Sequence, residues 1–427
     1  MATCPAGVEE LVAGELRGLR GGTAAEIAPE RGAVTFRGDW RTVYAANLEL
    51  RCANRVLVEL SRSAAANDRE LAHGAAWLLE GEHDWCGLHA GALLAPERSI
   101  SVSVAAAGSR LTDVRWIAQR TKDGLVDAQR RRFEQRSSVD REAADVPLRV
   151  LLRDDVATYL LDTSREPLDR RGYRVRAVDA PLREHLAAAC VLAADSVTGR
   201  AQRGAEEEDQ IVASGPGAWR GGPILDPMCG SATLLVEAAW HRLGLPPGRL
   251  RERWMFEDLP HFDRGVWSAV RAAARADVAI SDDRGNGAGV RLFGADIDGV
   301  ALEAARSNLG RAGLLGSASL RRGDCFQLEA PPGPGLLLLN PPYGERIGPR
   351  GSGAGRARRA ADPAHEAPTA DAWRRLGDLF KQRYRGWRAV VLAGGEGLGK
   401  EIGLRPSLRL PVRNGPLEAR ILVFDLY

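Results

Sequence analysis

Lysine is nearly missing from this chain, and arginine makes up almost its whole basic complement. Only Lys122, Lys381 and Lys400 are lysines among 59 basic residues, and 56 acidic residues leave a formal net charge of +3. A chain this close to neutral does not hold nucleic acid through bulk charge alone, as a basic tail does. The excess of arginine accompanies many alanines and glycines, as is typical of a GC-rich genome, and carries no functional information.

Cysteine is also scarce, and no two of the six cysteines have the CxxC spacing that is typical of metal or redox sites. We therefore expect reduced, mostly buried thiols, as in a cytosolic protein. No run approaches the roughly 18 apolar residues of a membrane span. Glutamates at 9, 10 and 15 interrupt the N-terminal segment, which does not look like a signal peptide. The sequence predicts a cytoplasmic protein without a membrane partner and leaves the oligomeric state open.

Apolar residues, in contrast, make up 44% of the 427 residues, enough for two or three folded domains. Helix and strand signals alternate over residues 1–62, which predicts a first small α/β region. A second is expected over 63–165, with a strand at 99–104, a helix at 109–132 and a hairpin around Asp154-Asp155. We expect a linker over 166–181 and a third, larger domain over 182–427.

The third domain alternates apolar runs with helical segments, which favours a parallel sheet with right-handed crossovers. Near its end, Asn414-Gly415 separates two apolar runs, which predicts a closing antiparallel hairpin. Residues 200–222 and 348–370 are rich in glycine and charge and have no apolar period, so both are interpreted as surface insertions.

The most specific motif is Asn340-Pro341-Pro342-Tyr343, directly after the apolar run 336–339. Open α/β sheets place ligands at this end of a strand. The two prolines fix the backbone and remove competing N–H donors, so the Asn340 amide oxygen and the Pro341 carbonyl can accept from one amino group. Tyr343 supplies a flat face for a planar ring. The motif predicts a site for a planar amine: adenine, cytosine, guanine or a side-chain amide.

Three weaker motifs precede it, each at an expected strand end. Residues 225–233 join a strand to a helix and contain Asp226, Met228 and Gly230, with no Walker lysine. Asp296 follows the next strand, where an acidic residue commonly accepts both ribose hydroxyls. Asp324 follows one strand later and can accept from an adenine amine. Each motif alone is also compatible with a simple cap or turn, but their order favours a cofactor site.

This ordered set resembles the class I S-adenosylmethionine-dependent methyltransferases that act on amino groups. The similarity extends along the chain to the bacterial ribosomal RNA large-subunit methyltransferase K/L family, in its L half. It is carried by residues 2–11, 47–56, 122–127, 168–174, 180–184, 340–347 and 413–415. The resemblance implies a Rossmann-like class I α/β fold with a C-terminal antiparallel hairpin. Before it come a ferredoxin-like region and a THUMP domain, a module that binds RNA.

The resemblance also implies roles for single residues. Asp226, Met228 and Gly230 would line the methionine part of S-adenosylmethionine, Asp296 the ribose and Asp324 the adenine. Asn340, Pro341 and Tyr343 would hold a guanine whose 2-amino group is methylated, most simply in 23S ribosomal RNA. The family usually has glycine where this chain has Ala232. We expect this departure to be tolerated if the backbone there is helical.

The segment from Arg110 to Arg136 has eight basic and four acidic residues, a local charge of +4. Lys122, Arg130, Arg131, Arg132 and Arg136 are the candidate RNA contacts, and a solvated helix face is the alternative interpretation. His83, Cys86 and His89 have ligand-like spacing, but no second ligand pair follows, so no metal is expected. Two alternatives stay open: a tRNA guanine-N2 methyltransferase and a non-catalytic RNA-binding assembly factor. Adenine-N6 DNA methylation shares the Asn-Pro-Pro-Tyr turn but would not explain the match to an RNA-binding module.

Overall fold

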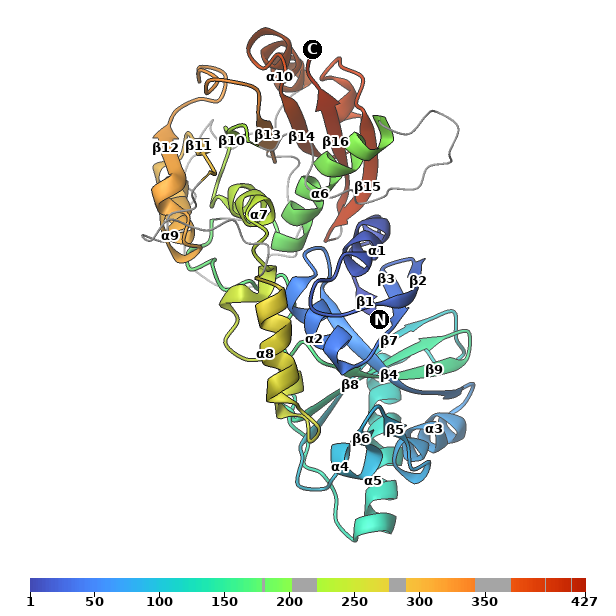
Figure 1. Ribbon diagram of the computed structural model, residues 1–427. Helices are drawn as coiled ribbons and strands as arrows, with labels where there is room; N and C mark the ends of the chain where they lie inside the picture. Colours follow the sequence, from blue (N-terminus) through green and yellow to red (C-terminus); the bar gives the residue numbers. More distant parts are fainter. Residues whose placement is uncertain (179–180, 202–220, 276–288, 342–369, 396, 416) are drawn as a thin grey trace, which may run out of the picture.

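Two seven-stranded sheets dominate the computed structural model (Figure 1), which describes residues 1–178, 181–201, 221–275, 289–341, 370–395, 397–415 and 417–427. The first sheet is built from residues before 163 and the second from residues after 223. A two-stranded ribbon, β5 (Asp84–Trp85) with β6 (Leu88–His89), is separate. No helix among the described residues is long and apolar enough to cross a membrane.

The first sheet joins the two N-terminal regions into one layer, in the order β2-β3-β1-β4-β9-β8-β7. Strand β4 makes the join, because it pairs with β1 on one side and β9 on the other. The expected hairpin at 154–155 is present, and Asp39 caps the N-terminus of α2 by accepting the N–H of Thr42. The strands are β1 (Ala2–Thr3), β2 (Ala25–Glu30), β3 (Ala33–Arg37), β4 (Arg55–Ala64), β7 (Ile100–Ala107), β8 (Val146–Arg153) and β9 (Val156–Asp162). The helices are α1 (Glu9–Arg17), α2 (Trp40–Glu49), α3 (Asp68–Glu80), α4 (Ala90–Leu93) and α5 (Val114–Phe133).

The second sheet confirms the predicted class I methyltransferase fold, with the order β12-β11-β10-β13-β14-β16-β15. Its first five strands are parallel, and β14, β16 and β15 pair antiparallel, as Asn414-Gly415 predicted. The strands are β10 (Ile224–Asp226), β11 (Leu292–Asp296), β12 (Ala318–Arg322), β13 (Leu336–Leu339), β14 (Arg388–Gly394), β15 (Leu408–Asn414) and β16 (Leu417–Asp425). Both expected insertions fall largely outside the described residues.

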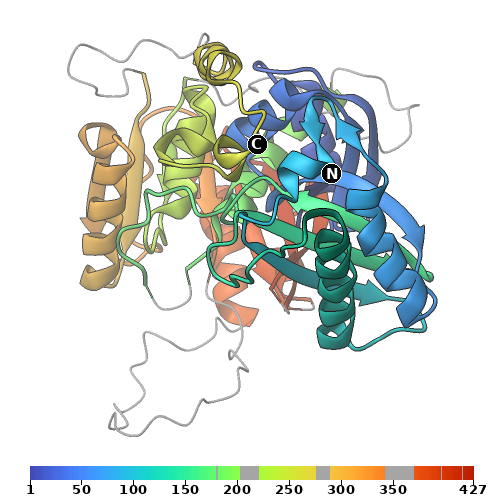
Figure 2. The same ribbon diagram turned by 90° about the horizontal axis from the view of Figure 1, so that it is seen from below.

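Helices cover both faces of this sheet. Those on one face share a continuous apolar core with the first sheet, while α10 packs on the other face through Trp373 and Phe380. Seen from below, α9 and α5 lie on opposite sides of the molecule (Figure 2). The helices are α6 (Glu184–Ala201), α7 (Thr233–Arg242), α8 (Arg264–Ala273), α9 (Gly299–Arg311) and α10 (Ala370–Arg383), and short 3-10 turns lie at Pro247–Leu250, Met255–Asp258, Leu315–Ser317 and Leu398–Lys400.

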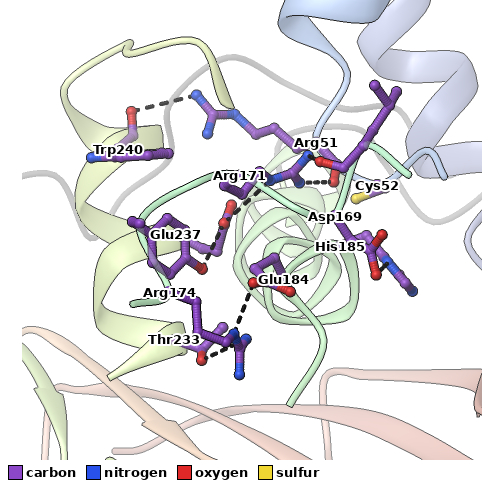
Figure 3. Close-up of polar contacts among 12 residues, drawn as sticks. Arg51, Cys52, Asp169, Arg171, Arg174, Glu184, His185, Thr233, Glu237 and Trp240 are labelled. Atoms are coloured by element: carbon purple, nitrogen blue, oxygen red, sulfur yellow. Dashed lines mark hydrogen bonds and ion pairs between the residues drawn. The ribbon is translucent and has the colours of Figure 1, made fainter. Parts of the chain in front are cut away.

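The two halves of the molecule are joined by a buried polar network (Figure 3). The guanidinium of Arg171 is 1% exposed and donates to the carbonyl of Arg51, to the carbonyl of Leu168 and to Glu237 of α7. Arg51, in turn, donates to the carbonyl of Leu245 at 2.5 Å. Because buried charges are stable only when paired and hydrogen-bonded, this network fixes how the N-terminal sheet sits on the second sheet and its helices.

Candidate active site

The four predicted motifs meet at the carboxyl edge of the second sheet. Asp226, Asp296 and Asn340 lie at or directly after the ends of β10, β11 and β13, and Asp324 lies two residues beyond β12. The spatial order β12-β11-β10-β13 places the four turns side by side. The strand order reverses direction between β10 and β13, which is where α/β sheets of this kind bind ligands.

A carboxylate holds two of these turns together. Asp296 accepts the N–H of Gly230 at 2.8 Å and that of Asp298 at 2.9 Å. Cys229 N–H donates to the Ala295 carbonyl at 2.8 Å, which adds a second tie between the same turns. Gly230 has a φ of +50°, and a Cβ built on it would meet nothing within 4 Å. The turn is therefore rigid, and its backbone faces open space wide enough for a ligand to approach closely.

Asp226 is a buried carboxyl group at the base of this site. It is 1% exposed, and its Oδ1 accepts the N–H of Met228 at 3.1 Å. Burial, with a smaller contribution from the nearby Asp296, raises the pKa of Asp226 to about 8, against the lowering effect of the Met228 N–H. This carboxyl group is largely neutral at pH 7. A cation that binds beside it would favour its ionised form, and the carboxylate would then pair with the cation.

Ala232, directly before α7, adopts the left-handed conformation, with a φ of +65° and a ψ of 25°. The sequence led us to expect that this alanine is tolerated through a helical backbone, and that condition is not met. A left-handed alanine costs roughly 1 kcal/mol because its Cβ crowds the neighbouring carbonyl. The Ala232 side chain is fully buried, so the packing around it offsets the free-energy cost of the left-handed backbone.

Asp324 closes the site on the β12 side. Its Oδ1 accepts the N–H of Phe326 at 3.0 Å, which shapes the turn after the strand. The Phe326 ring is partly buried in the second apolar core, and the Arg375 guanidinium carbon lies 4.0 Å from the ring centroid. The turn therefore combines an acceptor with an aromatic face, which suits a heteroaromatic ring.

Asn340 ends the buried strand β13, and Pro341 follows it as a buried residue. Among the described residues, the side-chain oxygen of Asn340 is buried and has no hydrogen-bond partner. A buried acceptor without a partner costs about 1–3 kcal/mol, so such a group is usually satisfied when a ligand binds. Tyr343, the aromatic member of the motif, lies outside the described residues.

Asn308, on α9, supports the cofactor turn and was missed by the sequence analysis. Its Nδ2 donates to the Ser231 carbonyl at 3.0 Å, and its Oδ1 accepts the N–H groups of Val175 and Arg176 at 2.9 and 3.0 Å. A fully buried asparagine among the alanines of a helix was the available signal. The linker is thus tied directly to the turn that carries Gly230.

The candidate RNA-binding residues occupy different environments on α5 and just beyond it. Arg130 and Arg136 are exposed, and the only ion pair formed by Arg130 within the described structure is a surface contact of 3.2 Å to Asp127. Lys122 is half-buried and lies 2.9 Å from Asp123. Exposed pairs of this kind contribute about 0–1 kcal/mol, so an incoming phosphate can displace them.

Two other arginines of the run are held against α3. Arg131 pairs with Glu80 at 2.6 Å, and Arg132 donates to the Leu79 carbonyl at 3.0 Å. Both contacts position α5 on α3. These two arginines therefore have a structural role that the sequence pattern did not reveal.

Three family models match the chain in order. Residues 1–57 match the RlmL ferredoxin-like domain, 88–162 the THUMP domain and 216–421 the RMKL-like methyltransferase domain. A "Putative RNA methyltransferase" of Synechocystis sp. is 31% identical over all of this chain and 96% of the relative. "Ribosomal RNA large subunit methyltransferase K/L" of Methylococcus capsulatus is 34% identical over all of this chain and 51% of the relative. The chain thus spans about half the length of the K/L relatives.

Solved structures have the same fold along their full length. A possible methylase from Clostridium difficile superposes with a TM-score of 0.76 at 23% identity, covering 100% of this chain and 97% of the other. The SMU.472 structure, a complex with SAH, gives a TM-score of 0.74 at 24% identity, again covering 100% and 97%. At these identities the likeness establishes the shared fold, including the N-terminal sheet.

Proposed function

Since this chain belongs to the RMKL-like family of THUMP-domain methyltransferases, we propose that it methylates RNA at the exocyclic 2-amino group of a guanosine, with S-adenosylmethionine as methyl donor. Large-subunit (23S) ribosomal RNA is the proposed substrate, because the K/L relatives carry that name. A protein that modifies this RNA in a bacterium works in the cytoplasm, which agrees with the cysteine usage.

One observation supports the proposal most directly: the buried amide oxygen of Asn340, at the carboxyl end of β13, has no hydrogen-bond partner among the residues that the structure describes. Together with the carbonyl of Pro341, it offers two acceptors to the two hydrogens of one amino group. Tyr343 would stack on the base. The alternative interpretation of the motif, a rigid turn, does not account for an acceptor left without a partner.

The 2-amino nitrogen of guanine is a poor nucleophile because its lone pair is delocalised into the ring. Two acceptors on its hydrogens would turn that lone pair toward the sulfonium methyl group. The nitrogen becomes acidic only as it gains the methyl, so no general base has to act first. Positioning for in-line displacement then supplies most of the rate. The target must be unpaired or flipped out of a helix to reach Asn340.

The cofactor supplies an electrophilic methyl group on a positively charged sulfur. The described residues fit such a group: the turn at Gly230 is open, Asp296 and Asp324 provide acceptors, and the neutralised Asp226 can recover its charge beside a cation. We propose that Asp226, Met228 and Gly230 hold the methionine part, Asp296 the ribose and Asp324 the adenine.

The deciding experiment is methyl transfer from labelled S-adenosylmethionine to ribosomal RNA, tRNA and DNA in separate reactions, followed by nucleoside analysis. We expect N2-methylguanosine in ribosomal RNA, and N2-methylguanosine confined to tRNA would instead identify a tRNA enzyme. Label in adenine of DNA would contradict the guanine assignment. Calorimetric titration with S-adenosylmethionine addresses the non-catalytic alternative, which rests only on Ala232 and requires that the cofactor not bind.

A further inference from the structure

A cleft of about 260 Å³ separates the N-terminal region from the C-terminal hairpin of the catalytic sheet. The loop containing Gly7 and the β2–β3 turn containing Arg31 line one side, and residues of β15, β16 and the turn after β14 line the other. Arg413, Arg420 and Glu418 are the charged residues of the second wall. Three arginines against one glutamate give the cleft a net positive charge.

The backbone of both walls is fixed. Glu9 accepts the N–H of Gly7 through one carboxylate oxygen and that of Gly32 through the other, each at 2.7 Å. Gly7 has a φ of +99°, and a Cβ there would lie 1.8 Å from the Pro411 carbonyl oxygen, so only glycine permits this approach. Arg413 N–H donates to the Ala6 carbonyl at 3.3 Å, which closes the base of the cleft.

The arginine side chains, by contrast, are poorly neutralised. Arg413 lies 3.7 Å from Glu418, and the two side chains are 52% and 77% exposed, so this pair is weak. Arg31 and Arg420 are exposed. Within the described part of the chain, no carboxylate oxygen lies within 4.0 Å of either guanidinium, the limit for an ion pair. Three arginines that share a cleft with a single, weakly paired carboxylate favour an anion between them, and the guanidinium fork matches phosphate geometry.

The cleft opens at the same sheet edge as Asn340. Strand register pairs Leu339 of β13 with Val391 of β14 and pairs Ala393 of β14 with Arg420 of β16. β13 and β16 are therefore two strand spacings apart, roughly 10 Å. A nucleotide whose base reaches Asn340 would thus carry its neighbouring phosphates toward the cleft.

We propose that this cleft binds backbone phosphates of single-stranded RNA beside the target nucleotide. The inference rests on the proposed RNA methyl transfer and adds a second RNA contact, distinct from the arginines of α5. It also explains how a nearly neutral protein holds RNA: the anion site is local, and it is assembled only where the two halves of the molecule meet.

The test is binding of a fluorescent oligouridylate, which has a phosphate backbone and no guanine, to the full chain at several salt concentrations. The triple variant Arg31→Gln, Arg413→Gln and Arg420→Gln should bind at least tenfold more weakly. The slope of log affinity against log salt should fall by about 0.7 for each lost phosphate contact, or about 2 in all.

A matched control removes the same charge elsewhere: Arg311→Gln, Arg405→Gln and Arg409→Gln, all exposed and none lining the cleft. This control should keep wild-type affinity and slope. The proposal is overturned if the cleft variant binds like the wild type, or if both triple variants weaken binding equally, which would indicate bulk charge.

Methyl transfer by the wild type is measured in parallel and separates the two proposals. If the wild type transfers methyl groups and the cleft variant binds oligouridylate as tightly as the wild type, the cleft site is ruled out and the proposed function stands. Cleft-dependent binding without transfer removes the proposed function and leaves an RNA contact. Unchanged S-adenosylmethionine affinity in the cleft variant shows that the catalytic domain is folded.

Discussion

Asn340 is the residue on which turnover should depend most, because its amide oxygen is one of the two proposed acceptors. Asn340→Ala removes one of two acceptors for the amino group, and the loss of one such positioned group costs roughly a hundredfold or more in turnover. Methyl transfer is measured with saturating RNA, and S-adenosylmethionine binding should stay intact. Asn340→Asp keeps an acceptor oxygen and should lose less. Near-normal turnover of Asn340→Ala would remove the assignment.

Asp226 predicts a pH dependence of cofactor binding. Because burial raises its pKa to about 8, the carboxyl group is mostly protonated below that pH and must release a proton to pair with the cationic cofactor. Affinity should therefore rise with pH between about 6 and 7.5, by up to roughly tenfold per pH unit. Titration calorimetry in buffers of different ionisation enthalpy measures the released proton. Asp226→Asn should bind weakly at every pH in this range, and a pH-dependent variant would contradict the mechanism.

Ala232 should be a source of instability that a single substitution removes. Ala232→Gly relieves the left-handed strain and should raise the free energy of unfolding by about 1 kcal/mol, measured by urea denaturation. Ala238→Gly, inside the right-handed turns of α7, is the control and should lower it by about 1 kcal/mol or more. A destabilised Ala232→Gly would mean that packing of the methyl group outweighs the strain.

At the scale of elements, α5 should contact RNA through only part of its arginine run. All four arginines are exposed, but among the described residues Arg130 and Arg136 make no hydrogen bond or ion pair with α3. The double variant Arg130→Gln and Arg136→Gln should lower the slope of log affinity for RNA against log salt by about 1.4. Arg311→Gln, on α9 at the far side of the molecule, is the control. Arg131→Gln should instead lower the free energy of unfolding by at most about 1 kcal/mol, because it breaks an exposed contact of α5 with Glu80. If the double variant and Arg311→Gln change the salt dependence of RNA binding equally, the arginine face of α5 is only solvated and does not contact RNA.

Several elements could be predicted from sequence because their signals are local. The hairpin at Asn414-Gly415 follows from turn chemistry, and the strand before Asn340 follows from a continuous apolar run. The pairing of β4 with both β1 and β9 was not predicted, because strand partners about 50 and 100 residues apart leave no local pattern. The conformation of Ala232 was missed for the opposite reason: neighbouring turns impose it against the local preference.

At the scale of the whole molecule, Arg171 should be the residue on which the joint depends. Arg171→Met leaves Glu237 as an uncompensated buried charge and should lower the free energy of unfolding by about 3–5 kcal/mol. Adding Glu237→Leu should restore much of this loss, because an apolar pair can replace a buried ion pair. Equilibrium unfolding of both variants tests the expectation. A double variant no more stable than Arg171→Met would show that the lost backbone contacts of Arg171 dominate.

The contact between Gly7 and Pro411 also has a consequence for folding during synthesis on the ribosome. The two residues are 404 positions apart (411 − 7), so a ribosome working at roughly 5–20 residues per second needs roughly 20–80 seconds between them. During that interval the N-terminal sheet can fold, but the strand that meets its Gly7 loop does not yet exist. A nascent chain therefore carries the arginines of α5 before the cleft beside the candidate active site can form. On the proposed role of the cleft, RNA can bind there only after β15 has been synthesised, which is later than the whole N-terminal sheet.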